Sequence, residues 1–239
     1  MKDVKLPTHI NEDVAYLCGV LVGDGHLSVR KSKHEYAIYC LGHKNDEREF
    51  YDKVIIPLFN KTFSVNVKIK SSDRDTTYGF VFYSKVLVNY FSRLGIPTGN
   101  KSSRIRIPTI FKSSDNLLIS FIRGLADTDF CLTLKRRYKK IQYYPVIVGV
   151  SKSKDIIYEI SKYLKKLGFR PSLETRKQFD KRVQKLVVTY ALYLYGHKQT
   201  VMWMQIIGFK SSKHLKKFDL WKKRNIDNAR ANSAFRILG

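Results

Sequence analysis

The sequence contains one short apolar segment twice, as LCGVLVGDG over residues 17–25 and as FIRGLADTDF over residues 121–130. Each copy has a glycine near its centre and another small residue four positions later, namely Gly19 and Gly23 in the first copy and Gly124 and Thr128 in the second. Residues four apart share one face of an α-helix. Each segment therefore predicts a helix with a flat face, on which the backbone of a second helix can lie close.

A carboxylate follows the apolar run in each copy, Asp24 in the first and Asp129 in the second. The C-terminus of a helix is the negative end of the helix dipole, so the position disfavours an acid. Two such helices packed side by side would bring the two carboxylates together, and close carboxylates are tolerated mainly when a cation neutralises them. The duplicated segment therefore predicts a metal site between two packed helices.

Both segments resemble the LAGLIDADG motif of the homing endonuclease family. Leu17–Gly25 aligns with all nine positions of the motif, and Ile122–Phe130 aligns with them again. The first copy departs from the motif at Val22, where its first aspartate would stand, and the second departs at Phe130, where its last glycine would stand. The acid at the eighth position, which the resemblance implies is essential, is present in both copies.

The charge of the chain favours a nucleic-acid partner. The 239 residues include 45 Lys and Arg against 20 Asp and Glu, which gives a net charge of +25. The excess is spread along the chain among 15 Tyr and 14 Phe, which favours nucleic acid over a membrane surface or an acidic protein. The alternative is a solvated, lysine-rich surface, which also accompanies growth at high temperature.

The segments that would direct a protein out of the cell are not expected here. The N-terminus lacks the apolar core of a signal peptide, and no apolar run approaches the roughly 20 residues needed to cross a bilayer. The three cysteines, Cys18, Cys40 and Cys131, form an odd set without CxxC spacing, which favours a reducing compartment. We expect an intracellular, cytoplasmic protein associated with the nucleoid.

The remaining sequence repeats along with the motif. Each half is predicted to have the order αββαββα, which gives an α+β fold of two halves related by a pseudo-two-fold axis. Each half would contribute an antiparallel sheet to a DNA-binding saddle, with the motif helices packed at the centre. The predicted division is an N-terminal half (1–97), a linker (98–112), a C-terminal half (113–209) and a basic tail (210–239).

Element boundaries follow from the hydrophobic pattern and from Gly and Pro positions. Strands are predicted over 26–30, 36–41, 65–70, 78–83, 131–135, 144–150, 172–176 and 186–195. Helices other than the motif helices are predicted over 45–59, 84–94, 154–167, 199–207 and, in the tail, 215–228. Asp24 and Asp129 are 105 positions apart and Lys44 and Lys152 are 108 apart, the slowly growing offset that an internal repeat predicts.

The proposed metal site would hold Mg²⁺, with Mn²⁺ as a substitute, because Mg²⁺ prefers oxygen ligands and shares its shell with water and phosphate. Its ligands are expected from Asp24 and Asp129 and from their neighbours Gly23 and Thr128. The family resemblance further implies a basic residue near the end of the second strand of each half. Here these are Lys44 and Lys152, which are expected to be catalytic by polarising water or balancing charge in the transition state. Each also lies at the start of a helix, where a lysine is often plain surface.

The outer faces of the strands are expected to contact DNA, with phosphates held by cations and base edges read in the major groove. Solvation of an outer sheet face is the alternative for any single hairpin, and Lys85 and Lys198 could equally be phosphate anchors or helix surface. The candidates are Arg30, Lys31, Lys33, His43, Lys68, Lys70, Arg74 and Lys85 in the first half, and Lys135, Arg137, Ser151, Arg176, Lys181, Arg182 and Lys198 in the second.

The resemblance implies a monomeric, site-specific endonuclease that hydrolyses double-stranded DNA with a metal ion and leaves a short staggered break within a long recognition site. Intron homing, from an intron-encoded or free-standing gene, is expected in preference to an intein, because no splicing Cys or Ser begins the sequence. The alternative is a protein of the same fold that does not cleave, either a maturase that binds its host intron RNA or a DNA-binding regulator.

Overall fold

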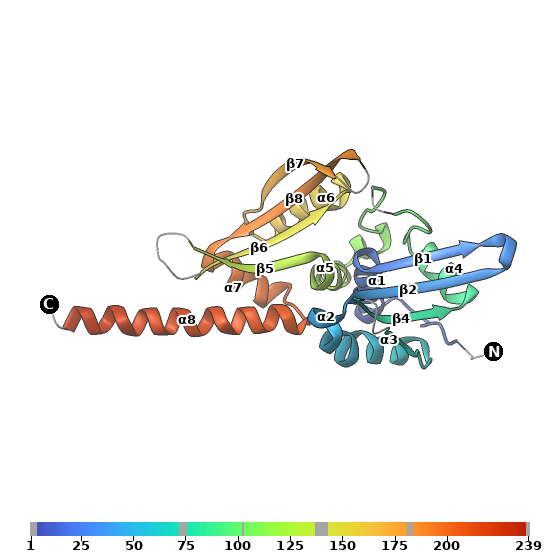
Figure 1. The fold of residues 1–239 in the computed structure, drawn as a ribbon, viewed down its shortest axis with the longest axis horizontal. Coiled ribbons are helices and arrows are strands. Elements are labelled where there is room, and N and C mark those ends of the chain that lie inside the picture. The colour runs from blue at the N-terminus through green and yellow to red at the C-terminus, as the bar shows by residue number, and fades with distance from the viewer. Residues whose placement is uncertain (1–3, 72–75, 102, 137–142, 181–183, 238–239) are drawn as a thin grey trace.

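Two four-stranded antiparallel sheets lie on either side of a central pair of helices in the computed structural model (Figure 1). The structure describes residues 4–71, 76–101, 103–136, 143–180 and 184–237. The central helices are α1 (Glu12–Gly23) and α5 (Asp115–Asp129), which contain the two motif copies. Helix α1 begins after Asn11, whose side chain accepts a hydrogen bond from the Val14 N–H at 3.0 Å and so caps the helix.

The two sheets have the same topology, and this confirms the predicted duplication. The first sheet has the order β1-β2-β4-β3 and the second has the order β5-β6-β8-β7. The strands of the first sheet are β1 (Gly25–Arg30), β2 (Glu35–His43), β3 (Ile69–Ser71) and β4 (Thr77–Tyr83). The strands of the second are β5 (Phe130–Lys135), β6 (Tyr144–Ser151), β7 (Ser172–Asp180) and β8 (Lys185–Tyr195).

Helices pack on one face of each sheet and leave the other face open. In Figure 1, α6 lies behind the strands of the second sheet. In β5 the side chains of Phe130 and Leu132 are buried whereas that of Cys131 is half-exposed, and in β1 Leu27 is buried whereas His26 is exposed. This alternation places the apolar side chains on the helices and turns their neighbours toward the open face.

The remaining helices complete the two halves and the tail. The first half contains α2 (Lys44–Phe50), a π-helical turn (Tyr51–Ile55), α3 (Ile56–Phe63) and α4 (Lys85–Arg93), with a short 3₁₀ turn at Lys31–Lys33. The second half contains α6 (Lys154–Lys166) and α7 (Gly196–Ile206), and α8 (Ser212–Ile237) follows it. A further 3₁₀ segment, Thr109–Ser113, precedes α5. None of these helices, over the described residues, is long and apolar enough to cross a membrane.

Two predicted elements of the first half differ from the structure. The strand predicted over 65–70 is wrong for most of its length, because only Ile69–Ser71 pairs with β4. The Val67 N–H donates to Asn60 Oδ1 at 2.9 Å instead, which ties this segment to the end of α3. The helix predicted over 45–59 extends to Phe63 and contains the π-helical turn. Its α-helical part restarts at Ile56, directly after the π-helical turn, so that Pro57 stands in the first turn of α3.

The second half also extends further than predicted. β7 continues to Asp180 instead of ending at residue 176, and α8 covers Ser212–Ile237 instead of residues 215–228. Both extensions are in charged segments whose hydrophobic pattern is weak. The division into 1–97, 98–112, 113–209 and 210–239 stays a prediction.

Candidate functional site

The two motif helices touch backbone to backbone, as their small residues predict. A Cβ added at Gly19 would lie 2.1 Å from the Phe121 carbonyl oxygen and 2.7 Å from the Leu125 amide nitrogen. A Cβ added at Gly124 would lie 2.1 Å from the Tyr16 carbonyl oxygen. Neither contact leaves room for a larger residue, so the glycines set how closely α1 and α5 cross.

This crossing brings the two motif acids together. Asp24 is the C-cap of α1, with its N–H donating to the Val20 carbonyl, and Asp129 is the last residue of α5. The end of α1 lies against the end of α5, because a Cβ at Gly23 would be 2.0 Å from Thr128 Oγ1 and 3.3 Å from Asp129 Cγ. The acids therefore lie at the centre of the molecule, between the two sheets.

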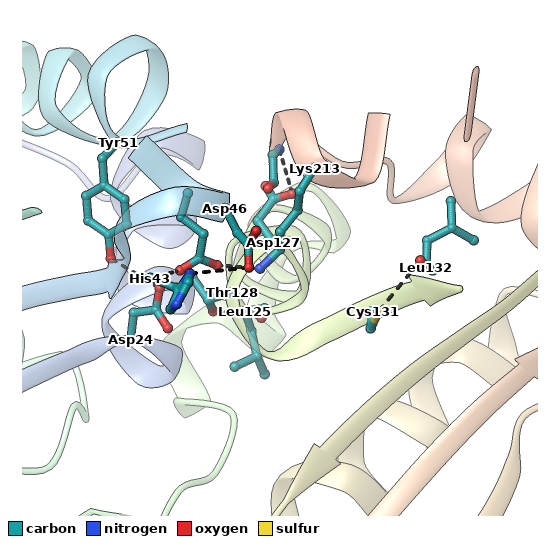
Figure 2. Close-up of polar contacts among 12 residues, drawn as sticks. Asp24, His43, Asp46, Tyr51, Leu125, Asp127, Thr128, Cys131, Leu132 and Lys213 are labelled. Carbon is teal, nitrogen blue, oxygen red and sulfur yellow. Dashed lines mark hydrogen bonds and ion pairs between the residues drawn. The ribbon is translucent and has the colours of Figure 1, made fainter. Parts of the chain in front are cut away.

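The surroundings of Asp24 favour its neutral form. Burial raises the pKa of Asp24 from 3.8 to about 7, and the carboxylates of Glu47 and Asp129 add to the rise. The Tyr51 hydroxyl opposes the rise, since it donates a hydrogen bond to Asp24 Oδ2 at 3.1 Å (Figure 2). A site that holds several carboxylates this close has a strong electrostatic preference for a cation.

Two lysines provide part of the missing positive charge, and neither was predicted from the sequence. Burial raises the pKa of Asp129 to about 6, whereas Lys101 and Lys213 lower it. Asp129 has the more accessible side chain of the acid pair, so water opposes the rise in its pKa more than it does for Asp24.

Lys101 caps the C-terminus of α1. Its Nζ donates to the carbonyl oxygens of Leu21 at 2.7 Å, Val22 at 2.5 Å and Gly23 at 2.8 Å. A cation at this end of a helix is favourable for the helix dipole. Burial lowers the pKa of Lys101 to about 8, although the nearby acids oppose that shift. The lysine therefore offsets the unfavourable position of the aspartates.

Lys213 reaches the same centre from α8 (Figure 2). It forms an ion pair with the buried Glu47, whose second oxygen, Oε2, accepts a hydrogen bond from the His43 N–H at 2.7 Å. Lys101 lies eight positions after the end of α4, and Lys213 lies seven positions after the end of α7. The two lysines thus occupy equivalent places after the last helix of each half, and this position in the repeat is the sequence signal that could have identified them.

A third acid of the motif region, Asp127, holds the chain that leads to α8. Asp127 is fully buried and accepts a hydrogen bond from the Tyr16 hydroxyl at 2.6 Å. Its Oδ1 also accepts from the N–H groups of Lys210 and Ser211, each at 2.9 Å. These contacts join α1, α5 and the start of α8. The Lys213 side chain depends on them for its position, because α8 begins at Ser212.

Comparison with known proteins agrees with this geometry. The model of the LAGLIDADG-like domain matches residues 116–208. Homing endonuclease I-DmoI of Desulfurococcus mucosus is 29% identical, over 69% of this chain and 77% of that protein. The resemblance to the LAGLIDADG family that the duplicated motif predicts is thus confirmed for residues 116–208. A structure of I-DmoI in complex with DNA and Mn has a TM-score of 0.57 and 21% identity, over 82% of this chain and 96% of that one. LAGLIDADG homing endonuclease I-GzeII in complex with its DNA target has a TM-score of 0.56 and 10% identity, over 93% and 92%.

The chain also matches small parts of much longer proteins. A component of the A-type ATP synthase of Pyrococcus abyssi is 26% identical over 193 residues, which are 79% of this chain and 17% of that protein. The replication factor C small subunit of Methanocaldococcus jannaschii is 26% identical over 208 residues, which are 87% of this chain and 10% of that protein. The chain thus spans less than a fifth of the length of either of these two relatives.

Among the residues predicted for the metal site, the structure brings Asp24 and Asp129 together but gives other partners to the neighbouring groups. The Gly23 carbonyl accepts a hydrogen bond from Lys101, and the Thr128 hydroxyl donates to the Leu125 carbonyl at 2.9 Å. No group of three or more His, Cys, Asp or Glu side chains within the described part of the chain is arranged to hold a metal alone.

The lysines predicted as catalytic follow the ends of β2 and β6. Lys44 is half-buried at the start of α2, where its N–H donates to the Thr76 carbonyl at 2.7 Å, and Lys152 is exposed in the turn after β6. The cations whose charge acts on Asp24 and Asp129 are Lys101 and Lys213 instead. Catalytic roles for Lys44 and Lys152 stay predictions.

The predicted DNA contacts are spread over the strands and turns of the LAGLIDADG fold. His43 pairs with Asp46 at 3.3 Å, Ser151 Oγ accepts from the Ser153 N–H at 3.1 Å, and Arg30 pairs with Glu35 at 3.3 Å. Lys85 lies over Tyr36, and both Lys135 and Arg176 lie over the ring of Tyr193. The side chains of Lys31, Lys33, Lys68, Lys70 and Lys198 are exposed. Arg74, Arg137, Lys181 and Arg182 lie outside the described residues.

Proposed function

We propose that this LAGLIDADG protein is a site-specific endonuclease that hydrolyses phosphodiester bonds in double-stranded DNA with the help of a divalent cation. The observation that carries the proposal is the pair of acids, Asp24 and Asp129, held at the ends of two crossed helices between two open sheet faces. The related I-DmoI and I-GzeII are homing endonucleases whose structures contain DNA. The chain has the same fold.

The donor set at the helix ends suits a hard cation such as Mg²⁺, with Mn²⁺ as a substitute. The two carboxylates supply oxygen ligands, and the charge of Asp129 contributes to the raised pKa of Asp24. No group of three or more His, Cys, Asp or Glu side chains in the described residues is arranged to hold a metal by itself, so phosphate and water oxygens would complete the shell, as is common for Mg²⁺. When bound, the cation supplies activation of water and stabilisation of the leaving 3′-oxygen.

The protein groups around the acids have separate tasks. Asp24 and Asp129 hold the cation and fix the scissile phosphates against the helix ends. Lys101 and Lys213 place positive charge beside the phosphates, where negative charge increases in the transition state. Glu47 orients Lys213 through their ion pair. Tyr51 fixes the Asp24 carboxylate by its hydrogen bond.

The open sheet faces would bind the DNA on both sides of this centre. A two-stranded β-ribbon fits the major groove, where base edges carry an unambiguous pattern of donors and acceptors. The net charge of +25 supplies the phosphate contacts. Each half, 1–97 and 113–209, would read one half-site. Because one chain contains both acids, the protein would act as a monomer. Its DNA target would lie inside the cell. Two related half-sites approaching two phosphates would give a break with a short stagger.

The test is cleavage of a plasmid library that carries randomised inserts, with Mg²⁺ in one arm and EDTA in the other. A discrete double-strand cut that requires the cation supports the proposal and identifies the recognition site. Tight, salt-sensitive binding without any cut would overturn it in favour of a non-cleaving regulator or an intron RNA maturase. Measuring binding to the host intron transcript in parallel would distinguish the maturase, which binds that RNA, from the DNA-binding regulator.

A further inference from the structure

Helix α8 begins at the acid centre and then runs beside the second sheet. Lys213 pairs with Glu47, and Lys216 pairs with Glu49 at 2.6 Å, so the first turns of α8 are fixed to α2. The helix contacts β5 as well, and Figure 1 shows it continuing past the end of that strand. A helix of Ser212–Ile237 therefore extends the protein surface outward from the site where we place the scissile phosphates.

One face of α8 packs on the protein. His214 and Trp221 are buried and Phe218 is half-buried, at the i, i+4, i+7 spacing of one helix face. The His214 ring lies 4.4 Å from the ring of Phe209, and the Trp221 ring lies 5.3 Å from that of His197. This packing sets the rotation of the helix, and so determines where its charged side chains point.

A second stripe, of cations, lies next to the packed face. Lys213, Lys217 and Arg224 occur at i, i+4 and i+11, which is one face of an α-helix of 3.6 residues per turn. The Lys217 Nζ lies 3.6 Å from the Sγ of Cys131. Cys131 is on the open face of β5, since its neighbours Phe130 and Leu132 are buried in the core. The stripe therefore leads from the acid centre along the open face of the second sheet.

The charge and length of this stripe fit the backbone of a duplex. Residues 210–224 contain seven Lys and Arg and one acid, Asp219, which pairs with Lys222 at 2.7 Å. At 1.5 Å per residue, Lys213 and Arg224 are separated by roughly 16 Å along the helix axis. A DNA strand advances about 3.4 Å per phosphate, so the stripe spans roughly five phosphates.

We propose that Lys213, Lys217 and Arg224 form a phosphate-binding ridge for DNA that lies on the open face of the second sheet. The ridge would strengthen the grip on the half-site at the second sheet, because α8 contacts β5 of that sheet. The inference rests on the proposed function, since it requires DNA across the saddle.

The test compares Lys217→Gln with Lys223→Gln on the same helix. Both residues are exposed, and each substitution lowers the net charge equally. Lys223 shares the face of Lys216, seven positions earlier, and not the face of the ridge. The probe is a duplex of mixed sequence, about four turns of B-DNA long, in EDTA, with the apparent binding constant measured as a function of salt concentration. Far-UV circular dichroism verifies that both variants are folded.

Loss of one phosphate contact makes the negative slope of log K against log salt shallower by about 0.9 and weakens binding at 0.1 M salt by roughly eightfold. We expect this for Lys217→Gln, with Lys223→Gln close to the parent. Equal slopes for both variants, whether both unchanged or both reduced, would overturn the ridge. If the parent protein itself shows no salt-dependent binding, the proposed function fails first, and cleavage of the plasmid library would show the same failure independently.

Discussion

Replacing Asp24 by Asn should make the folded protein more stable at pH 8, although it removes an acid that we place at the catalytic centre. Asn has nearly the same shape, and its Oδ1 can still accept the hydrogen bond from the Tyr51 hydroxyl. The substitution removes the charge that Glu47 and Asp129 disfavour. The predicted gain is therefore electrostatic, and it should depend on pH in a defined direction.

The sign follows from proton binding. The pKa of Asp24 rises from 3.8 to about 7 on folding, so between these values the folded protein binds more protons than the unfolded chain. The free energy of unfolding of the parent protein therefore falls as pH rises through this window. At about 1.36 kcal/mol per pKa unit, the full pKa shift corresponds to about 4 kcal/mol of unfolding free energy. Because the side chain is only half-buried and salt screens it, we expect about 2 kcal/mol, or about 4–8 °C in Tm.

The assay is thermal unfolding of both proteins in EDTA from pH 5 to pH 8. The Tm difference should be largest at pH 8 and should fall to roughly 40% of that value at pH 5, where Asp24 is neutral in the folded parent protein but ionised in the unfolded chain. Asp46→Asn is the matched control, because it removes one charge from an exposed position nearby and surface changes alter stability by less than about 0.5 kcal/mol. A loss of stability at pH 8, or a gain that does not change with pH, would refute the electrostatic account of the centre.

Three further substitutions test the packing and the charges around the acids. Gly124→Ala should cost about 1–3 kcal/mol in urea unfolding even though Ala favours helices, because the new Cβ would meet the Tyr16 carbonyl at 2.1 Å; an unchanged midpoint would contradict the close crossing. Asp127→Asn replaces one accepting oxygen by an NH₂ group, so it should weaken the hydrogen bonds to Tyr16 and to the Lys210 and Ser211 N–H groups and should speed amide exchange at the start of α8; unchanged exchange there would contradict the anchoring role. Lys101→Met should slow cleavage by about 10²-fold, with the exposed Lys152→Met as the comparison; a larger loss for Lys152→Met would favour the lysine predicted from sequence.

The fold was predictable because its determining features are local and occur twice. A small residue every four positions predicts a close helix pair, and strict alternation predicts the strands. The prediction failed at Val65 and Val67, where alternation was present but the backbone had another partner. Near the end of α3, Asn60 accepts hydrogen bonds from the N–H groups of Val65 and Val67. Asn60 lies outside the strand-length window in which alternation is counted, so the pattern could not predict these hydrogen bonds.

The site was predictable only in part, for a similar reason. Asp24 and Asp129 end the motif itself, so their meeting follows from the helix crossing. The other groups of the site come from separate segments: Lys101 from the predicted linker, Lys213 from the tail and Glu47 from α2. Their approach to the two acids depends on the complete fold. The repeat offered one usable signal, the lysine that follows the last helix of each half, but a chain with 45 Lys and Arg contains many other candidates.

The most direct test of the account is plasmid cleavage by the parent protein and by the Asp24→Asn and Asp129→Asn variants. All three are assayed on the recognition site identified from the library, with Mg²⁺, and their affinity for the same duplex is measured without metal. We predict that each substitution abolishes cleavage while affinity stays the same or increases, because removing a negative charge favours DNA. Cleavage at the parental rate by either variant would contradict the claim that the two helix-end acids are the catalytic centre.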